Sequence, residues 1–485
     1  MNKQFVAVDL GATSGRVMLA SVGRRSFEMR SMNRFANDPV YLWNGNRIAM
    51  HWDLPGLFAG VCAGLAEAGR QVAELTSVSV DSWAVDYGLL RDGKLLGQPY
   101  NYRDARGAIG ADLVHTRMAQ DEVYARNGLQ FLPFTTMFQL AADAQEGLIG
   151  SADAALLVPD LIGYWLTGAT ATERTNASTT GLLGIDGRWD DELVALLGLR
   201  ARLFPDLIEP GTTLGGLLPE LAQRIGVTAG VQVTTVASHD TASAVVAVPM
   251  AAESAAYISC GTWALVGVEL PRPIVTAATR AANFTNEVGA DNRIRFLRNV
   301  MGLWVMSESV RQWTREGMPI DLPDLLDQAA HCPRTPDVFD ADDPGFLEPG
   351  DMPARIRAWY AEHDLPAPQT LPEMARAIVE SLAAGFARGV QQAADLSGTP
   401  VETVHIVGGG AQNRLLCQLL ADRVERPVVA GPVEATAIGN VLIQARAHGV
   451  LSGDLEALRA TLKKSGATIL STETYVPQRT PAGKA

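Results

Sequence analysis

The fold is decided by the stretch VAVDLGATSGRVMLA at residues 6–20. Two β-rich runs, 5–10 and 16–22, lie on either side of a turn of Gly, Ala, Thr and Ser, which predicts a β-hairpin. Glycine allows positive φ, so consecutive backbone N–H groups in such a turn can converge on a phosphate. An ordinary tight hairpin is the alternative. The turn is not a P-loop, because the Gly-x-x-x-x-Gly-Lys-Ser/Thr string is absent.

The side chains of this stretch favour the phosphate interpretation. Thr13 and Ser14 add hydroxyl donors, and Arg16 adds a guanidinium whose fork suits phosphate geometry. Asp9 stands at the end of the first strand, where a carboxylate can hold Mg²⁺ directly or through water. The stretch therefore predicts one side of a polyphosphate site with a metal ligand beside it.

A similar pattern returns past the middle of the chain. Residues 255–259 predict a strand, Cys260 and Gly261 a turn, and 262–268 a second strand. Gly261 is expected to offer a free backbone N–H, and Thr262 offers a hydroxyl. Two such turns that face each other can clamp a polyphosphate from both sides. The repetition predicts a duplicated architecture, with a second ordinary hairpin as the alternative.

Further elements alternate between helix and strand. After Asp53, apolar residues recur at the spacing of one helical face from Leu54 to Leu65, and 76–80 predicts a strand. Asp92-Gly93 between short apolar runs is typical of a hairpin turn. Hairpins mixed with helices predict an α/β fold in which a mixed sheet is covered by helices.

The second half of the chain contains longer segments of distinct character. Residues 319–372 are rich in Pro, Asp and Gly and are predicted to form a surface excursion. A long helix is predicted from about 373 to 396, followed by a buried strand at 404–407. We expect a helix to begin near Asn413 and the residues after 470 to form a frayed tail.

Composition narrows the class of protein. The 485 residues carry a net charge of −13 and no basic tract, which argues against a nucleic-acid binder. With 47% apolar and 19% charged residues, the chain can build sizeable cores. The absence of a long apolar run or a secretory pattern predicts a cytoplasmic protein that does not span a membrane. The 4 cysteines lie far apart, unlike a disulfide framework or a zinc pattern.

Three consecutive glycines, Gly408, Gly409 and Gly410, lie between the strand at 404–407 and the helix near Asn413. Without side chains they let a flat ring approach the backbone closely, which favours the binding of a nucleotide base or ribose. A tight strand-to-helix turn is the alternative. Because consecutive glycines are costly to order, the functional interpretation is preferred.

A second group of polar residues, His239-Asp240-Thr241, follows the strand expected at 231–236. A carboxylate at a strand end that opens a helix is well placed to act as a general base. A metal-hydrolase site would need clustered histidines, but the 7 histidines are scattered along the chain. The structural alternative is a helix N-cap at Asp240.

An indole lies among acidic residues in the run Asp81-Ser-Trp83-Ala-Val-Asp86, and Tyr-Arg-Asp-Ala-Arg follows at 102–106. Such a group suits a polyol, because the aromatic face covers C–H groups while charged groups bind hydroxyls. A core tryptophan beside a surface ion cluster is an equally good interpretation.

Together these motifs resemble the FGGY carbohydrate kinases of the actin-like ATPase superfamily. Six blocks occur in the family's order, and each block is weak singly. The blocks are VAVDLGATSGRVMLA (6–20), NGLQFLPF (127–134), ASHDTASAV (237–245), NVMGLW (299–304), HIVGGGAQN (405–413) and AGPVEAT (430–436).

The resemblance implies an α/β fold of two actin-like (ribonuclease H-like) domains. Each would be a mixed five-stranded sheet flanked by helices, with the active-site cleft between the domains. The first domain, 1–245, would bind the sugar and carry the first phosphate loop. The second domain, 246–470, would bind the nucleotide, and 471–485 would be a tail.

The resemblance also implies a reaction, in which the γ-phosphoryl group of ATP passes to the 1-hydroxyl of a ketose, with Mg²⁺ as cofactor. L-Rhamnulose is the expected ketose, and L-fuculose and L-xylulose are alternatives. The partners would be these small molecules alone, with no nucleic acid and no membrane, and the protein would be a monomer or homodimer. A non-catalytic nucleotide sensor or ATPase-type chaperone on the same fold stays open, but neither needs a sugar-facing acid such as Asp240.

Candidate residues follow from the motifs and the resemblance together. The resemblance assigns the catalytic base to Asp240, and Asp9 is the metal candidate. Ala84 stands where a glycine is common, so only its backbone is assigned to the sugar, and Ser307 stands where a longer Gln holds ATP in some members. The ATP-binding candidates are Ala12, Thr13, Ser14, Gly15, Arg16, Gly261, Thr262, Ser307, Gly409 and Gly410. The sugar-binding candidates are Trp83, Ala84, His239, Asp240, Thr241 and Asn299.

Overall fold

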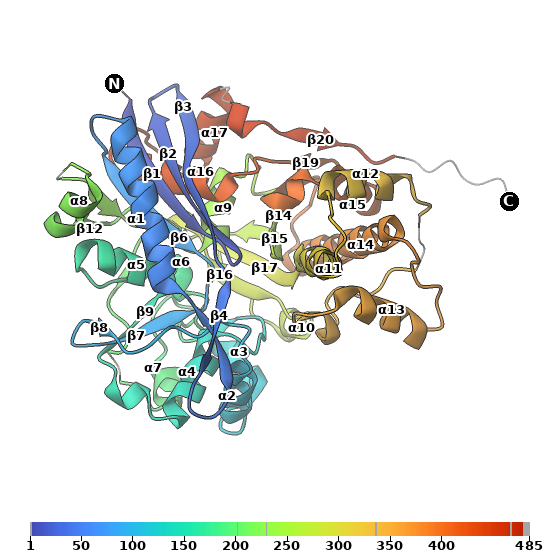
Figure 1. The fold of residues 1–485 in the computed structure, drawn as a ribbon, viewed down its shortest axis with the longest axis horizontal. Helices are drawn as coiled ribbons and strands as arrows, with labels where there is room; N and C mark the ends of the chain where they lie inside the picture. Colours follow the sequence, from blue (N-terminus) through green and yellow to red (C-terminus); the bar gives the residue numbers. More distant parts are fainter. Residues whose placement is uncertain (1, 201, 229, 335–336, 466–467, 479–485) are drawn as a thin grey trace. The chain divides into compact units, whose positions relative to one another are not determined.

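A computed structural model describes residues 2–200, 202–228, 230–334, 337–465 and 468–478 (Figure 1). The chain divides into two compact units, each assembled from separate segments. Within the described part of the chain, no helix is long and apolar enough to cross a membrane. Unit 1 comprises Met1–Pro249, Leu270–Phe296 and Glu434–Leu470, and unit 2 comprises Met250–Glu269, Leu297–Val433 and Ser471–Ala485.

Unit 1 is built on a six-stranded mixed sheet with the order β12-β13-β6-β1-β2-β3. Its strands are β1 (Lys3–Leu10), β2 (Ser14–Val22), β3 (Phe27–Ala36), β6 (Ser77–Ser82), β12 (Thr213–Gly216) and β13 (Gln232–Thr234). The predicted hairpin is confirmed, because β1 and β2 pair antiparallel. On its other edge β1 pairs parallel with β6, and β6 with β13. β1 is buried from Phe5 to Leu10, as expected of a central strand covered on both faces.

The register of this sheet gathers charged side chains at the carboxyl end of β1. Asp9 pairs with Arg16 of β2 on one side and with Asp81 of β6 on the other. Because a shift of one residue would turn each side chain to the opposite face of the sheet, the surrounding apolar pattern fixes this arrangement. The predicted metal candidate therefore lies in the interior of the sheet rather than on a surface loop.

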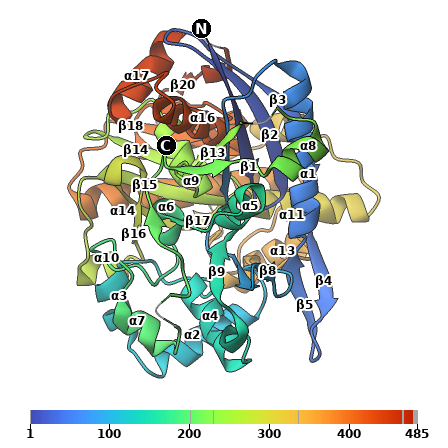
Figure 2. The ribbon, with the colours of Figure 1, turned by 90° about the vertical axis from the view of Figure 1, so that its left-hand side faces the viewer.

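Two helices from distant parts of the chain pack together in unit 1. α16 (Ala435–Ala447) contacts β1, β6 and α9 (Asp240–Ala247), and Figure 2 shows α16 beside α9. Gly439 permits the close crossing, because a Cβ there would lie 1.8 Å from the carbonyl oxygen of Ser243. Gln444 of α16 donates to the Val6 carbonyl oxygen at 3.0 Å, which ties the helix to the central strand.

The remaining helices of unit 1 include the one expected after Asp53. α1 begins there, and the Asp53 side chain caps it by accepting from the Gly56 N–H at 3.0 Å. The helices are α1 (Leu54–Gln71), α2 (Arg106–His115), α3 (Gln120–Asn127), α4 (Thr136–Gln145), α5 (Val158–Thr167), α6 (Arg174–Ala177), α7 (Asp191–Leu196), α8 (Pro219–Ile225), α10 (Ala277–Ala281) and α17 (Leu455–Ser465).

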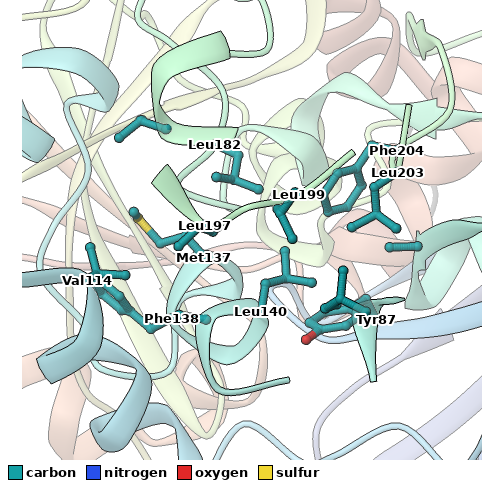
Figure 3. Close-up of a cluster of buried hydrophobic side chains, with 14 of the residues drawn as sticks. Tyr87, Val114, Met137, Phe138, Leu140, Leu182, Leu197, Leu199, Leu203 and Phe204 are labelled. Carbon is teal, nitrogen blue, oxygen red and sulfur yellow. The ribbon is translucent and has the colours of Figure 1, made fainter. Parts of the chain in front are cut away.

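The chain between β6 and β13 adds short strands and helices with a core of their own. Figure 3 shows this core, in which Leu140 of α4 lies next to Leu199 and Phe138 of the same helix lies next to Val114. The predicted turn at Asp92-Gly93 is confirmed by their φ angles of 48° and 74°. The short strands of unit 1 are β4 (Pro39–Trp43), β5 (Ile48–Trp52), β7 (Tyr87–Arg91), β8 (Lys94–Leu95), β9 (Ala154–Leu157), β10 (Thr172–Glu173), β11 (Leu207–Ile208) and β16 (Thr285–Val288).

Unit 2 repeats the mixed arrangement. Its strands follow the order β17-β15-β14-β18-β19-β20, with β14 antiparallel to β15 and parallel to β18. They are β14 (Ala255–Cys260), β15 (Trp263–Leu270), β17 (Ile294–Met301), β18 (Thr403–Val407), β19 (Val428–Ala430) and β20 (Glu473–Tyr475). The helices are α11 (Trp304–Arg315), α12 (Leu322–His331), α13 (Met352–Glu362), α14 (Leu371–Ser397) and α15 (Arg414–Val424).

The structure confirms mixed sheets flanked by helices and corrects several details. The sheet of unit 1 has six strands rather than five, because β12 pairs antiparallel with β13 at its edge, and the six strands given for unit 2 also exceed the expected five. The segment 319–372 is not a simple surface excursion, since it contains α12 and α13 and buries Phe339 and Phe346. Residues 473–475 were expected in a frayed tail but form β20 on the edge of β19. Residues 479–485 of that tail lie outside the described residues, and the domain boundary near 245 stays a prediction.

Gly439→Ala tests whether the close crossing of α9 and α16 holds unit 1 together. The added methyl would overlap the Ser243 carbonyl oxygen, so the helices must separate, and we expect a loss of about 3 kcal/mol in the free energy of unfolding. Gly385→Ala in α14 is the control, because the nearest atom to its Cβ is 3.9 Å away, and it should gain up to about 1 kcal/mol. Urea unfolding measures both, and equal midpoints for the two variants would contradict the prediction.

Candidate active site

The first glycine-rich loop joins β1 to β2, and one of its amides closes the turn. The Gly11 N–H donates to the Ser14 carbonyl oxygen at 2.9 Å. Asn37 supports the loop, since its side chain donates to the Gly11 carbonyl oxygen at 2.8 Å and its N–H to the Thr13 carbonyl oxygen at 3.1 Å. No described residue accepts a hydrogen bond from the N–H of Ala12 or Thr13. These two amides are therefore available for a phosphate.

Arg16, a candidate for phosphate binding, is engaged by two carboxylates. Its Nε lies 3.0 Å from Asp9 Oδ2, and its Nη1 donates to Glu434, the residue just before α16. The charge of Asp9 raises the pKa of Arg16, so the guanidinium stays charged. Contact between Arg16 and a phosphate stays a prediction.

Asp9, Asp81 and Asp240 form a group of carboxylates whose charges act on one another. Burial raises the pKa of Asp9 to about 6, with the Arg16 cation lowering it and the Asp240 charge adding to the rise. Burial and the Asp9 charge also hold the pKa of Asp81 well above its usual range. The Asn440 side chain donates to Asp81 Oδ2 at 2.6 Å. A buried group of like charges is unfavourable unless protons or a cation join it.

Asp240 is the most accessible of these three carboxylates and the first residue of α9. Its side chain is 31% exposed, whereas that of Asp9 is 4% exposed. Asp240 Oδ1 accepts from the Thr241 N–H at 2.5 Å and from the Thr241 hydroxyl at 3.2 Å. The N-cap position belongs to His239, so the alternative in which Asp240 caps the helix is wrong. An accessible carboxylate at a strand-to-helix junction has the placement of a general base.

The backbone leading to Asp240 is held by Glu173, which no sequence motif indicated. Glu173 is fully buried, and its Oε2 accepts from the Ser238 N–H at 3.0 Å and from the Ser238 hydroxyl at 2.7 Å. Its Oε1 accepts from the Thr175 N–H at 2.9 Å. Thr175 Oγ1 in turn accepts from the His239 N–H at 3.3 Å. Burial raises the pKa of Glu173, and these bonds oppose that rise.

Trp83 belongs to an aromatic group built around one buried carboxylate. The ring centroids of Trp83 and Trp52 lie 4.2 Å apart. Asp86 Oδ2 accepts from Trp52 Nε1 at 2.6 Å and from Trp83 Nε1 at 3.0 Å. The Tyr102 N–H donates to the same oxygen at 3.2 Å, and Gln139 donates to Oδ1 at 2.8 Å. Trp83 is only 5% exposed, so it is a core residue that can offer no more than an edge to a ligand.

The backbone at Ala84 is held in a strained turn. Val85, the next residue, has a φ of 68°, which a β-branched side chain rarely adopts and which costs on the order of 1–3 kcal/mol. The Asp86 N–H donates to the Ala84 carbonyl oxygen at 2.9 Å, and the Thr136 hydroxyl donates to the Val85 carbonyl oxygen at 2.6 Å. These bonds fix the segment that is the predicted backbone contact for the sugar.

The second glycine-rich loop, in unit 2, is closed in a similar way. The Gly261 N–H donates to the Trp263 carbonyl oxygen at 2.8 Å, so the expectation that this amide is free is wrong. The Thr262 N–H has no acceptor among the described residues and is the free amide of this loop. Gly302 allows the chain to approach, because a Cβ there would lie 2.5 Å from the carbonyl carbon of Trp263.

The three glycines after β18 have different environments. Gly408 has a φ of 79°, and a Cβ there would lie 2.9 Å from the Cys260 carbonyl oxygen. A Cβ on Gly410 would lie 2.4 Å from Cys260 Sγ. Packing therefore requires glycine at both 408 and 410. Gly409 is exposed, and the nearest atom to its Cβ is 3.4 Å away, on Leu303. Gly409 is therefore the glycine whose backbone a ring could reach.

The structure groups the candidate residues by unit. Gly15 is buried, and a Cβ there would lie 2.3 Å from the ring of Phe35, whereas Ser307 is exposed in the first turn of α11. Asn299 is half-buried on β17. Unit 1 contains Asp9, Ala12, Thr13, Ser14, Gly15, Arg16, Trp83, Ala84, His239, Asp240 and Thr241, and unit 2 contains Gly261, Thr262, Asn299, Ser307, Gly409 and Gly410.

The carboxylates of unit 1 fit a hard cation that brings further ligands with it. Asp81 Oδ1 is buried and accepts no hydrogen bond from any described residue. The part of the chain that the structure describes has no group of three or more His, Cys, Asp and Glu side chains able to hold a metal by itself. Mg²⁺ commonly uses one or two carboxylates and completes its shell with water and phosphate oxygens. The donor set therefore fits a cation delivered with a phosphate.

Sequence reasoning missed several residues that shape this site. Glu173, Glu287 and Arg295 lie outside every motif, and Glu434 lies inside a family block without an assigned role. Arg295 carried one usable signal, because it is a charged residue between the apolar Ile294 and Phe296 of a strand, and it is fully buried in the structure. Its partner His239 lies 56 residues away in the sequence, so no local pattern indicates that contact.

Comparison with known proteins matches nearly the whole chain. A model of the N-terminal domain of the FGGY family of carbohydrate kinases matches residues 4–247, and one of the C-terminal domain matches 256–448. The chain is 39% identical to a rhamnulokinase from Pectobacterium carotovorum over 466 residues, 95% of this chain and 91% of the relative. It is 37% identical to a rhamnulokinase from Bacteroides thetaiotaomicron over 482 residues, 99% of this chain and 96% of the relative.

Solved structures share the fold at low sequence identity. A ligand-bound xylulose kinase from Lactobacillus acidophilus superposes with a TM-score of 0.76 at 17% identity, covering 98% of this chain and 94% of the other. A xylulose kinase from Rhodospirillum rubrum gives 0.75 at 18% identity, covering 98% and 95%. At these identities the likeness concerns the fold, and it confirms the predicted two-domain α/β class.

The buried carboxylate of Asp86 predicts a distinct pH dependence of stability. Burial raises its pKa from the ordinary 3.8 to about 6 in the folded chain. The folded state then holds a proton that the unfolded state has lost, so the free energy of unfolding falls, by on the order of 3 kcal/mol, as the pH rises through this window. In Asp86→Asn the side chain cannot ionise, so this decline should be absent. Urea unfolding from about pH 4 to about pH 8 measures the difference, and parallel curves would contradict the prediction.

Proposed function

The chain belongs to the FGGY family of carbohydrate kinases, and on that premise we propose that it transfers the γ-phosphoryl group of ATP to the 1-hydroxyl of L-rhamnulose. The product is L-rhamnulose 1-phosphate, and the second product is ADP. The choice of ketose rests on the rhamnulokinases to which the chain is similar over at least 95% of its length. The observation that carries the reaction is Asp240, an accessible carboxylate among buried ones.

The proposed step is a single in-line displacement. O1 of the ketose attacks the γ-phosphorus, a new P–O bond forms, and the bond from the γ-phosphorus to the β–γ bridging oxygen breaks. The proton of the 1-hydroxyl passes to the Asp240 carboxylate, and the electron pair of the broken bond leaves with ADP. Phosphoryl transfer depends mainly on positioning and charge stabilisation, so one base and a set of fixed donors suffice.

The free amides supply the fixed donors. The N–H groups of Ala12 and Thr13 in unit 1 and of Thr262 in unit 2 lack protein acceptors and are proposed to bind phosphate oxygens. Because these amides are held by closed turns, they need little reorganisation during the reaction. Gly409, exposed at the end of β18, is proposed to lie against the adenine ring.

Asp9 is the residue proposed to hold Mg²⁺, through water, with the buried Asp81 beside it. The ion, when bound with ATP, supplies positive charge for the β- and γ-phosphates. The raised pKa values of Asp9 and Asp81 are consistent with a carboxylate pair arranged for a cation. With a net charge of −13, the protein attracts ATP through local donors rather than through its overall field.

Asp240→Asn tests the base. The amide keeps the shape of the side chain but cannot take the proton, so we expect kcat to fall by on the order of 10³-fold. The dissociation constant for ATP should change by less than about threefold, because the amide donors are elsewhere. A coupled ADP assay and titration calorimetry measure the two quantities. Turnover close to that of the unmodified protein would remove Asp240 from this role.

A panel of sugars tests the substrate. Initial rates with L-rhamnulose, L-fuculose, L-xylulose, L-ribulose and glycerol should be highest for L-rhamnulose in kcat/KM, and ³¹P NMR should place the new phosphate on O1. A strong preference for L-fuculose or L-xylulose would overturn the choice of ketose while leaving the reaction intact. ATP consumption that ignores every sugar would instead favour the sensor or chaperone class.

A further inference from the structure

A buried ion pair faces the imidazole next to the proposed base. Arg295 of β17 and Glu287 of β16 both belong to unit 1, because the division between the units falls within β17, after Phe296. Their side chains are 0% and 6% exposed. Arg295 Nη2 lies 3.1 Å from Glu287 Oε2. The same Nη2 and Nε donate to the Val288 carbonyl oxygen at 3.2 Å and 3.3 Å. The guanidinium is thus fixed in place before it meets the imidazole.

The contact between Arg295 and His239 has only one possible direction. Arg295 Nη2 lies 3.0 Å from His239 Nδ1 with hydrogen-bond geometry. A guanidinium has donors and no acceptor, so Nδ1 must accept and carry no proton. Glu287 Oε2 is farther from Nδ1, at 3.4 Å, and makes no hydrogen bond to it. The proton of the neutral ring therefore resides on Nε2.

His239 Nε2 lies close to the base. It lies 3.4 Å from Asp240 Oδ1, so a proton on Nε2 is close enough to act electrostatically on the carboxylate that is to accept the sugar's proton. The charged groups that face His239 are Asp240, Glu287 and Arg295. The ring thus offers a neutral donor in one fixed orientation.

We propose that Arg295, held by Glu287, is a positioning residue that fixes His239 as the Nε2–H tautomer and so orients Asp240 for proton transfer. The proposal rests on the proposed function of Asp240 as the base. Stability alone does not account for the pair, because apolar side chains of similar volume commonly replace a buried Arg–Glu pair without loss. The Arg295 cation has a function beside Asp240, because its hydrogen bond to Nδ1 selects the tautomer of His239 that carries its proton on Nε2.

The tautomer can be measured without any substrate. In ¹⁵N-histidine-labelled protein at about pH 7.5, the Nδ1 and Nε2 shifts of His239 should be those of an unprotonated and a protonated nitrogen. Comparison with His239→Gln assigns the signals. A proton on Nδ1, or on both nitrogens, in the unmodified protein would overturn the proposal, and this result does not depend on which sugar is used.

The double variant Glu287→Leu with Arg295→Met removes the pair while avoiding an unpaired buried charge. The His239 signals should then move toward a mixture of tautomers. The kcat should fall by about 10–100-fold while the KM for the ketose changes less than about threefold. Arg295→Lys keeps a cationic donor and should restore most of the rate. Unchanged His239 shifts in the double variant would contradict the assignment.

His239→Gln separates positioning from a merely structural role. A Gln amide donates to Asp240 without needing Arg295, so removal of the ion pair in this background should lower kcat by less than about twofold. Equal losses in both backgrounds would mean that Arg295 does not act through His239. The matched control is Arg376→Met with Glu380→Leu, which removes a buried pair of α14 in unit 2, 2.7 Å apart, and should change neither the shifts nor kcat.

Discussion

The register of β1 against its neighbours is the constraint on which the site depends. It sets Asp9 between Arg16 and Asp81 inside the sheet, where each charge must be balanced by the others. Because successive side chains of a strand point to opposite faces, a slip of one residue would turn Asp9 to the other face of the sheet and separate it from Arg16 and Asp81. The placement of the charges is thus a consequence of the register. Asn440 and Glu434, which come from the end of the chain, then complete the polar environment from α16.

Local elements of the fold could be predicted from the sequence, and distant assemblies could not. The hairpin at 5–22 and the helix after Asp53 carry their own signals, namely turn chemistry, periodicity and a cap. The helices α16 and α17 belong to unit 1 although they follow unit 2 in the sequence. This assignment depends on the packing of α16 on β1 and α9, which no local sequence pattern indicates. The Pro and Gly residues of 319–372 were interpreted as turn signals, and two helices were missed. Proline is also common in the first turn of a helix, where it stands in α12 and α13.

The same division holds for the candidate site. Asp240 and the glycine turns could be identified from the sequence because each belongs to a short motif of consecutive residues. Arg295 and Glu173 could not, because each acts on the segment before Asp240 from a distant part of the chain. Trp83 shows the opposite error, since a residue chosen for its face turned out to be held in the core by a neighbouring carboxylate. Residue type indicates possible chemistry, whereas burial decides which surface remains for it.

The two glycine-rich loops are the segments proposed to bind the phosphates of ATP, and their closed turns suggest how an acidic protein would do so. In each loop the first glycine uses its N–H to close the turn, and the free amides follow it in the chain. An amide that donates a hydrogen bond within its own loop cannot bind a ligand, but that bond fixes the direction of the neighbouring N–H groups. These donors carry no net charge, so they attract phosphate only at short range and are unaffected by the overall charge of −13. If oriented amides are the main phosphate donors, specificity depends on backbone geometry, and a side chain at Gly302 would disturb that geometry because its Cβ would lie 2.5 Å from the Trp263 carbonyl carbon in the second loop.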